Sequence, residues 1–348
     1  MVGSMRPVSG DPPADPSSEP PLRAGDWVEV RSLAEIRATL DGEGRRNGFL
    51  FMPEMVPFCG RRFQVSKRAE KTCYGSRFLR VGDAVHLAGA RCNGSAHDGC
   101  ELQCLTFWRE EWLRRVDGPQ EVGSRPAAAP AGPSAGTGSP VGTNRSTALP
   151  TRVDPPGDGT VFICQATALR DVTHEPVGPW NPRPYFHEIH VGNAGWTEAK
   201  QLIRWSLAWG RLRVFKAFSR QRSTPKVPRE RIDVGDWVEV RSAPEILATL
   251  TKSGKNRGLR LSEDMLTFCG ERFRVERSVT HFIDETTGRM KVMQSPCLVL
   301  ESATCRGFNI LCPRAQFHFW RPEWLRRLDG SSRAPPPDSP ASDPPPPT

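Results

Sequence analysis

The chain has 348 residues, enough for two or three domains, but its 34 prolines and 31 glycines are unevenly placed, so a good part of the chain is expected not to be globular. The net charge of +9 comes almost wholly from residues 196–231, which carry ten basic residues and two acids and so account for +8. This distribution argues against a protein-wide basic surface of the kind that grips nucleic acid.

No apolar run near the start resembles a signal peptide, and no stretch approaches the roughly 20 apolar residues of a membrane span. We therefore expect a reducing, cytoplasmic location, in which the ten cysteines serve as thiols or metal ligands rather than structural disulfides. The Pro-rich residues 1–23 and 331–348 are predicted to be disordered tails, and the Pro/Ala/Gly-rich residues 118–158 a disordered linker.

An internal repeat organises the rest of the chain. The segment GDWVEVRSLAEIRATL at 25–40 recurs as GDWVEVRSAPEILATL at 235–250, and FWREEWLRR at 107–115 recurs as FWRPEWLRR at 319–327. The offset between the copies drifts only from 210 to 212 residues. Two copies of one domain are therefore predicted, at 24–117 and 232–330.

Each copy is predicted to be mainly β. The first segment, DWVEVRS, alternates apolar and polar residues as a half-buried strand does. A short helix follows, because Ser32 with Glu35, like Ser242 with Glu245, has the spacing of a capping box. Further short strands and a closing EWLRR segment complete the unit. We predict tandem small SH3-like barrels.

The central segment, residues 159–231, differs from the repeats. Residues 160–167 are predicted to form a strand and residues 197–218 a basic helix, in which Trp205 and Trp209 share a side with leucines at helical spacing. Three interpretations stay open: packing against a barrel, contact with a partner protein or an anionic membrane surface, and nucleic-acid binding. The candidate binding residues are Trp205, Trp209, Arg204, Arg211 and Arg213.

Aligning the two copies separates shared cysteines from unshared ones. Cys59 matches Cys269 within an otherwise apolar FCG motif, which is typical of a buried structural thiol. Cys92 matches Cys305 and Cys100 matches Cys312, whereas Cys73 falls close to His281. A Cys that exchanges with a His is compatible with a zinc ligand, because both residues offer donors that zinc accepts.

These positions predict a structural zinc site in copy one and a less complete site in copy two. In copy one, His97 competes for one of four places, and the candidates are Cys73, Cys92, His97, Cys100 and Cys104. In copy two the candidates are His281, Cys305 and Cys312, with Cys297 or His318 available to complete the site. Four protein ligands leave no open position, so such a site is structural. Buried thiols and a redox pair are the alternatives.

The chain resembles a family of uncharacterised bacterial proteins. Its members share a GDWVEVRS opening, a CGRRF segment, a C-GSAH-GC-x3-C cluster and an FW-EWL ending, all present in copy one. Copy two, with CRGFNILC, matches only in part, while the central CQAT segment also fits the family. The resemblance supports the interpretation of the cysteine cluster as a metal site.

A duplicated domain without a nucleophile or acid–base constellation favours a non-catalytic binding or scaffold protein with a protein partner. Two alternatives stay open. One is a nucleic-acid-binding protein that uses residues 196–231. The other is an enzyme whose site forms between the two copies.

Overall fold

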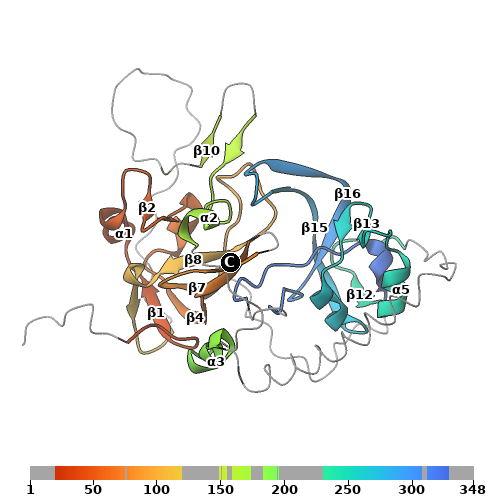
Figure 1. Cartoon of the computed structure of the whole chain (residues 1–348), viewed down its shortest axis with the longest axis horizontal. Helices are drawn as coiled ribbons and strands as arrows, with labels where there is room; N and C mark the ends of the chain where they lie inside the picture. Colours follow the sequence, from red (N-terminus) through yellow and green to blue (C-terminus); the bar gives the residue numbers. More distant parts are fainter. Residues whose placement is uncertain are drawn as a thin grey trace, which may run out of the picture.

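The computed structural model describes residues 20–74, 77–119, 149, 151–154, 159–173, 183–193, 195, 230–307 and 312–328. Within these residues the two repeats form two separate antiparallel sheets, each curled into a half-barrel (Figure 1). Helices are few and short. The prediction of a mainly β protein is therefore confirmed.

The first domain has a five-stranded sheet in the order β8-β7-β4-β1-β9. Its elements are β1 (Trp27–Val30), α1 (Leu33–Thr39), β2 (Arg45–Arg46), β3 (Phe49–Leu50), a 3₁₀ helix (Pro53–Phe58), β4 (Arg62–Arg68), β5 (Lys71–Tyr74), β6 (Arg77–Arg80), β7 (Ala84–Arg91), β8 (Leu105–Arg109), a second 3₁₀ helix (Glu110–Trp112) and β9 (Leu113–Arg115). The first and last strands pair with each other, so the sheet curls back on itself.

The second domain repeats this arrangement with the order β16-β15-β12-β17. Its elements are β12 (Trp237–Val240), α5 (Ala243–Ala248), β13 (Lys255–Asn256), β14 (Leu259–Arg260), a 3₁₀ helix (Glu263–Phe268), β15 (Arg272–Ile283), β16 (Met290–Leu300), a second 3₁₀ helix (Pro322–Trp324) and β17 (Leu325–Arg327). Trp27 pairs with Gln64 and Trp237 with Arg274, so the repeats agree even in strand register.

The repeated sequence explains the repeated structure. Val28 and Val30 are fully buried, while Trp27 and Glu29, which alternate with them along β1, are half-buried, as the strand pattern requires. Ser32 caps α1: its backbone N–H donates to Glu35 Oε2 at 2.8 Å, and its Oγ accepts from the Glu35 N–H at 3.3 Å. Four fully buried tryptophans anchor the two cores: Trp108, Trp112, Trp320 and Trp324.

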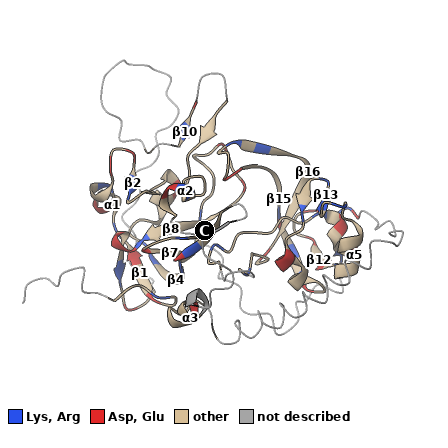
Figure 2. Cartoon of the chain, in the orientation of Figure 1, with Lys and Arg blue, Asp and Glu red and all other residues tan. Residues whose placement is uncertain are grey.

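The chain segment that connects the two domains contains β10 (Arg152–Val153), β11 (Val161–Phe162), α2 (Leu169–Val172) and α3 (Arg183–His190). The predicted strand at 160–167 is correct only for the two residues of β11. The predicted basic helix at 197–218 lies outside the described residues, as do almost all of the linker and both tails. Figure 2 shows acidic and basic residues interspersed through both domains.

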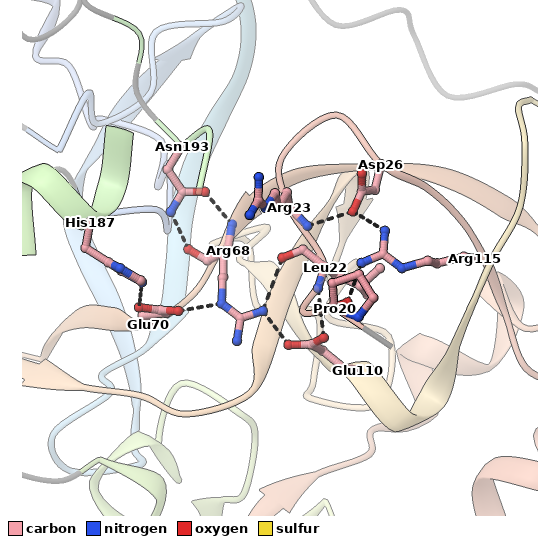
Figure 3. Close-up of polar contacts among 10 residues, drawn as sticks. All are labelled: Pro20, Leu22, Arg23, Asp26, Arg68, Glu70, Glu110, Arg115, His187 and Asn193. Atoms are coloured by element: carbon pink, nitrogen blue, oxygen red, sulfur yellow. Dashed lines mark hydrogen bonds and ion pairs between the residues drawn. The ribbon is translucent and has the colours of Figure 1, made fainter. Parts of the chain in front are cut away.

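A buried arginine ties the chain before β1 and the turn after α3 to β4 (Figure 3). The Arg68 guanidinium donates to Glu70 Oε1 at 2.5 Å, to the Leu22 carbonyl at 3.1 Å, and to Glu110. The Asn193 side chain pairs with the Arg68 backbone in both directions, at 2.5 and 2.7 Å. Part of the central segment is thereby fixed to the first domain.

The long β15–β16 hairpin of the second domain reaches the first domain. The Glu101 carboxylate accepts hydrogen bonds from the backbone N–H groups of Thr280 and His281, at 2.6 and 3.0 Å. The Arg277 guanidinium donates to the Glu101 carbonyl at 2.7 Å. The loop after Cys92 therefore packs against the other copy. Among the described residues, no helix has the length and apolar character needed to cross a membrane.

Candidate metal centres in the two domains

Each domain contains a cluster of one carboxylate, one thiol and one imidazole. Glu54, Cys92 and His97 form it in the first domain, where their ligand atoms all lie within 4.8 Å of one another. Asp264, Cys305 and His318 form the matching cluster in the second domain under the same limit. The acid and the histidine of both clusters are buried, and both cysteines are half-buried.

The acid and the cysteine occupy equivalent positions in the two repeats. Glu54 and Asp264 lie in the 3₁₀ helices that precede β4 and β15. Cys92 follows β7, and its backbone N–H donates to the Cys104 carbonyl at 2.9 Å. Cys305 follows β16, and its N–H donates to the Gln316 carbonyl at 2.7 Å. The duplicated backbone therefore brings the same two donors together twice.

The histidine, in contrast, comes from a different segment in each domain. His97 lies in the tight loop after Cys92, where its N–H donates to the Gly94 carbonyl at 2.9 Å. Gly94 has φ +71°, and a Cβ there would lie 2.2 Å from the Cys100 carbonyl oxygen, so the loop requires glycine. His318 instead lies two residues before Trp320, in a later segment of the chain than the loop that begins at Cys305.

The position of His318 has a cost that the first domain avoids. In the first domain the equivalent residue is Thr106, whose Oγ1 accepts a hydrogen bond from Trp108 Nε1 at 2.7 Å. In the second domain the corresponding Trp320 Nε1 is buried and has no hydrogen-bond partner among the residues that the structure describes. A buried donor left unpaired destabilises a protein by about 1–3 kcal/mol. The imidazole is therefore present at the expense of a core hydrogen bond.

Both ring nitrogens of His97 face acceptors. Nδ1 lies 2.5 Å from Glu54 Oε1, and Nε2 lies 2.9 Å from the Ile163 carbonyl oxygen. If Nε2 carries a proton and donates it to the Ile163 carbonyl, Nδ1 is directed at the Glu54 carboxylate. A proton or a cation must then lie between Nδ1 and the carboxylate, because both would otherwise be acceptors. Donation of the second ring N–H to a backbone carbonyl is also the usual way in which proteins orient a metal-binding histidine.

The charges in this cluster favour its ionised form. Burial alone would lower the pKa of His97, but its contacts with Glu54 and Ile163 outweigh burial and raise that pKa. Burial would likewise raise the pKa of Glu54, but His97 reverses the effect and lowers it. Glu54 Oε2 is buried and accepts no hydrogen bond from the described part of the chain, so the carboxylate keeps an unused lone pair inside the cluster.

The second cluster has even fewer internal hydrogen bonds. His318 Nε2 lies 2.9 Å from Asp264 Oδ2, but both atoms are buried without an aligned hydrogen bond. Asp264 Oδ1 accepts from Ser262 Oγ at 2.5 Å. Burial would raise the pKa of Asp264, but His318 and Ser262 outweigh it and lower the pKa. A buried carboxylate oxygen and a buried imidazole nitrogen that face each other, with a thiol beside them, are a donor set that fits a divalent metal ion.

The two thiols are poor nucleophiles where they stand. Burial is the main cause that raises the pKa of Cys92 and of Cys305, so both sulfurs are protonated at neutral pH. A bound metal ion would change this, because a thiol that coordinates a metal ion is deprotonated. The arrangement is thus suited to metal coordination and unsuited to attack on a substrate by a thiolate.

The predicted copy-one ligands divide into two groups in the structure. Cys92, His97, Cys100 and Cys104 all line one small cavity of about 30 Å³, together with Cys164 from the central segment. Burial raises the pKa of the Cys104 thiol to about 12. Cys73 does not line this cavity, and its sulfur instead lies 3.6 Å from Cys312 Sγ of the second domain.

The copy-two candidates are more scattered. Cys305 joins Asp264 and His318, whereas Cys297 is buried and has its pKa raised by burial to about 11. His281 on β15 lies beside Glu101 of the first domain, with Nδ1 3.5 Å from the carboxylate. The candidate binding residues of the basic helix all lie outside the described residues: Arg204, Trp205, Trp209, Arg211 and Arg213.

Sequence reasoning missed Glu54, Asp264 and Cys164 as members of these sites. Glu54 and Asp264 occupy matching positions in PEMVPFCG and EDMLTFCG, so alignment of the two repeats could have identified them. An acid kept between apolar residues of a predicted core segment needs a partner. For Cys164, the only sequence signal was its position in the CQAT segment.

Comparison with family models, curated proteins and solved structures finds no match to this chain.

Proposed function

We propose that the protein is a non-catalytic binding or scaffold protein whose two β domains each hold a zinc ion. The ligands are Glu54, Cys92 and His97 in the first domain, and Asp264, Cys305 and His318 in the second. One observation carries this proposal. The acid and thiol are inherited by duplication, but each domain supplies the imidazole from a different segment to the same place. Packing alone gives no reason for that convergence.

Zinc fits the donor set better than other common metals. Thiolate and imidazole are ligands that zinc prefers, while magnesium and calcium take oxygen ligands. Zinc also accepts carboxylate oxygen at about 2.0–2.2 Å. In the first domain the fourth ligand is a neighbouring cavity thiol, of which Cys100, Cys104 and Cys164 are available. In the first domain, a site closed in this way by four protein ligands would stabilise the fold, which suits a scaffold.

Two other uses of the clusters fit the contacts less well. A thiol protease-like triad needs a cysteine activated by histidine, whereas here the imidazoles face the acids and the cysteine pKa values are raised. A buried His97–Glu54 ion pair without metal accounts for the first domain. The matching His318–Asp264 contact at 2.9 Å accounts for those two residues in the second, but an ion pair gives no role to the thiol that each cluster contains.

We further propose that each domain is an SH3-like barrel. This is supported by the antiparallel order, by the short 3₁₀ helix before the final strand, and by the pairing of β1 with β9 and of β12 with β17. Small barrels of this kind offer loops for partner binding. A protein partner is our leading candidate, and nucleic-acid binding through 196–231 is the second.

The experiment is metal analysis of the full chain with matched thiol variants. The unaltered protein is expected to hold two zinc ions per chain, and Cys92→Ala and Cys305→Ala are each expected to hold one fewer. Cys59→Ala and Cys269→Ala are the controls, because these duplicated thiols lie in the FCG motif and outside both clusters. Unchanged metal content in the cluster variants, or no binding to the intact chain, would contradict the proposal.

A further inference from the structure

A second thiol site lies where the two domains meet. Cys73 is carried by β5 of the first domain and Cys312 by the segment after β16 of the second. Their sulfurs are 3.6 Å apart although the residues are 239 positions apart in the chain. Cys73 is half-buried and Cys312 is buried, so a solution reagent meets Cys73 first. Neither residue belongs to the two acid–thiol–imidazole clusters.

Charged groups surround this pair. Arg314 is almost fully buried, and its Nη1 lies 2.6 Å from the Cys73 carbonyl oxygen and 3.9 Å from Cys73 Sγ. The same nitrogen lies 2.9 Å from Glu285 Oε2, which fixes the guanidinium in place. Lys71, which pairs with Glu188 at 2.7 Å, contributes a second positive charge near Cys312. The cations favour a thiolate at this position.

The two sulfurs therefore differ in proton affinity. The hydrogen bond from Cys312 is the main cause that lowers the pKa of Cys73 to about 6, with Arg314 assisting against burial. The same contact raises the pKa of Cys312 well above its ordinary value. One sulfur is thus a thiolate at neutral pH, and the other is a thiol held against it. A nucleophile and a resolving thiol have this relationship.

We propose that Cys73 and Cys312 form an oxidation site at which a small disulfide, such as glutathione disulfide, creates a covalent bond between the two domains. The Cys73 thiolate attacks one sulfur of the reagent, whose S–S bond breaks and releases one small thiolate. The Cys312 thiol then loses its proton and attacks Cys73 Sγ, which releases the second small thiol. The two protein thiols are oxidised by two electrons, and the reagent is reduced to two thiols.

The bond would hold the two domains in the arrangement described above. Polar contacts join the two domains near this pair, such as the donation of Tyr74 Oη to the Glu285 carbonyl at 3.3 Å. Polar interfaces within a chain commonly permit relative motion of domains. A disulfide here removes that motion, because it closes a covalent loop through both domains. Disulfides of reducing compartments are usually transient and redox-sensing, which suits a reversible bond.

The test treats the zinc-loaded full chain with glutathione disulfide, blocks the remaining thiols by alkylation, and identifies cross-linked peptides by mass spectrometry. The expected product is a Cys73–Cys312 peptide that disappears on reduction. Cys312→Ala is expected to stop the reaction at a glutathione adduct on Cys73. Cys269→Ala, which removes a half-buried thiol away from the pair, is expected to form the cross-link as the intact chain does.

Two outcomes would overturn this inference: alkylation of both cysteines after oxidation, or a glutathione adduct spread equally over the other thiols. Zinc content is measured in the same samples, because the oxidation site shares no residue with the proposed metal ligands. A chain that binds no zinc before oxidation but forms the cross-link would refute the proposed function alone. Unchanged zinc without the cross-link would refute the oxidation site alone. Circular dichroism of each variant confirms that it is folded.

Discussion

The reactivity of Cys73 gives the most quantitative prediction. Its pKa is lowered to about 6 from an ordinary value of 9.0, first by the Cys312 hydrogen bond and then by Arg314. At pH 6 about half of such a sulfur is thiolate, against about 0.1 % for an ordinary thiol, a ratio of about 500. Intrinsic nucleophilicity falls with pKa at a Brønsted slope of about 0.4–0.5, which removes a factor of about 20. The net advantage is about 20-fold at pH 6 and about 4-fold at pH 7.

The assay is the rate of iodoacetamide alkylation at Cys73 in reduced protein, followed by peptide mass spectrometry across pH 4–10. The expected profile has its midpoint near pH 6. Cys312→Ala removes the hydrogen-bond donor and is expected to move the midpoint to higher pH. Cys312→Ser keeps a hydroxyl donor, so its midpoint is expected to lie between those of the intact protein and Cys312→Ala. A midpoint near 9 in the intact protein, or one that Cys312→Ala leaves in place, would refute the electrostatic reasoning.

Three further predictions concern stability. Chelation of zinc is expected to lower the melting temperature by about 10–20 °C, because a ligand present at 100 times its Kd contributes about 2.7 kcal/mol; calorimetry with and without chelator checks this. Arg68→Met is expected to destabilise the first domain by about 2–3 kcal/mol in urea titrations, because Glu110 loses its buried cation. In metal-free protein, Asp264→Asn with His318→Thr is expected to stabilise the second domain by about 1–3 kcal/mol, because Trp320 gains an acceptor; lower stability would contradict this.

Local sequence patterns predicted local structure well. The alternation in DWVEVRS predicted β1 and β12, and the Ser32–Glu35 spacing predicted the capped helix α1. These features depend on residues close together in the chain, so propensity and pattern suffice to find them. The repeat carried each success to the second domain. The strand expected at 160–167 was mostly wrong, since an apolar run alone does not distinguish a strand from other buried backbone.

The candidate sites were harder to predict because their members meet only through the fold. Cys92 and His97 were recognised from one loop, but Glu54 joins them from a 3₁₀ helix 43 residues away. Cys73 was grouped with the loop cysteines because it aligns with His281 of the other copy, yet it contacts Cys312 across 239 residues. Spacing identifies ligands on one turn, and it carries little information about which strand or domain will lie opposite.

In the second domain, the candidate site can be recognised from the core hydrogen bond that is missing beside it. A threonine at position 318 would satisfy Trp320 as Thr106 satisfies Trp108, and the core would gain a hydrogen bond. His318 instead leaves the indole unpaired and places an imidazole beside a buried carboxylate. Natural cores break such local rules mainly where another requirement outweighs stability. In the first domain the loop supplies His97, so Thr106 keeps its structural role. On the proposed metal role, the same requirement for an imidazole is met twice, and only the domain without a loop histidine gives up a core hydrogen bond for it.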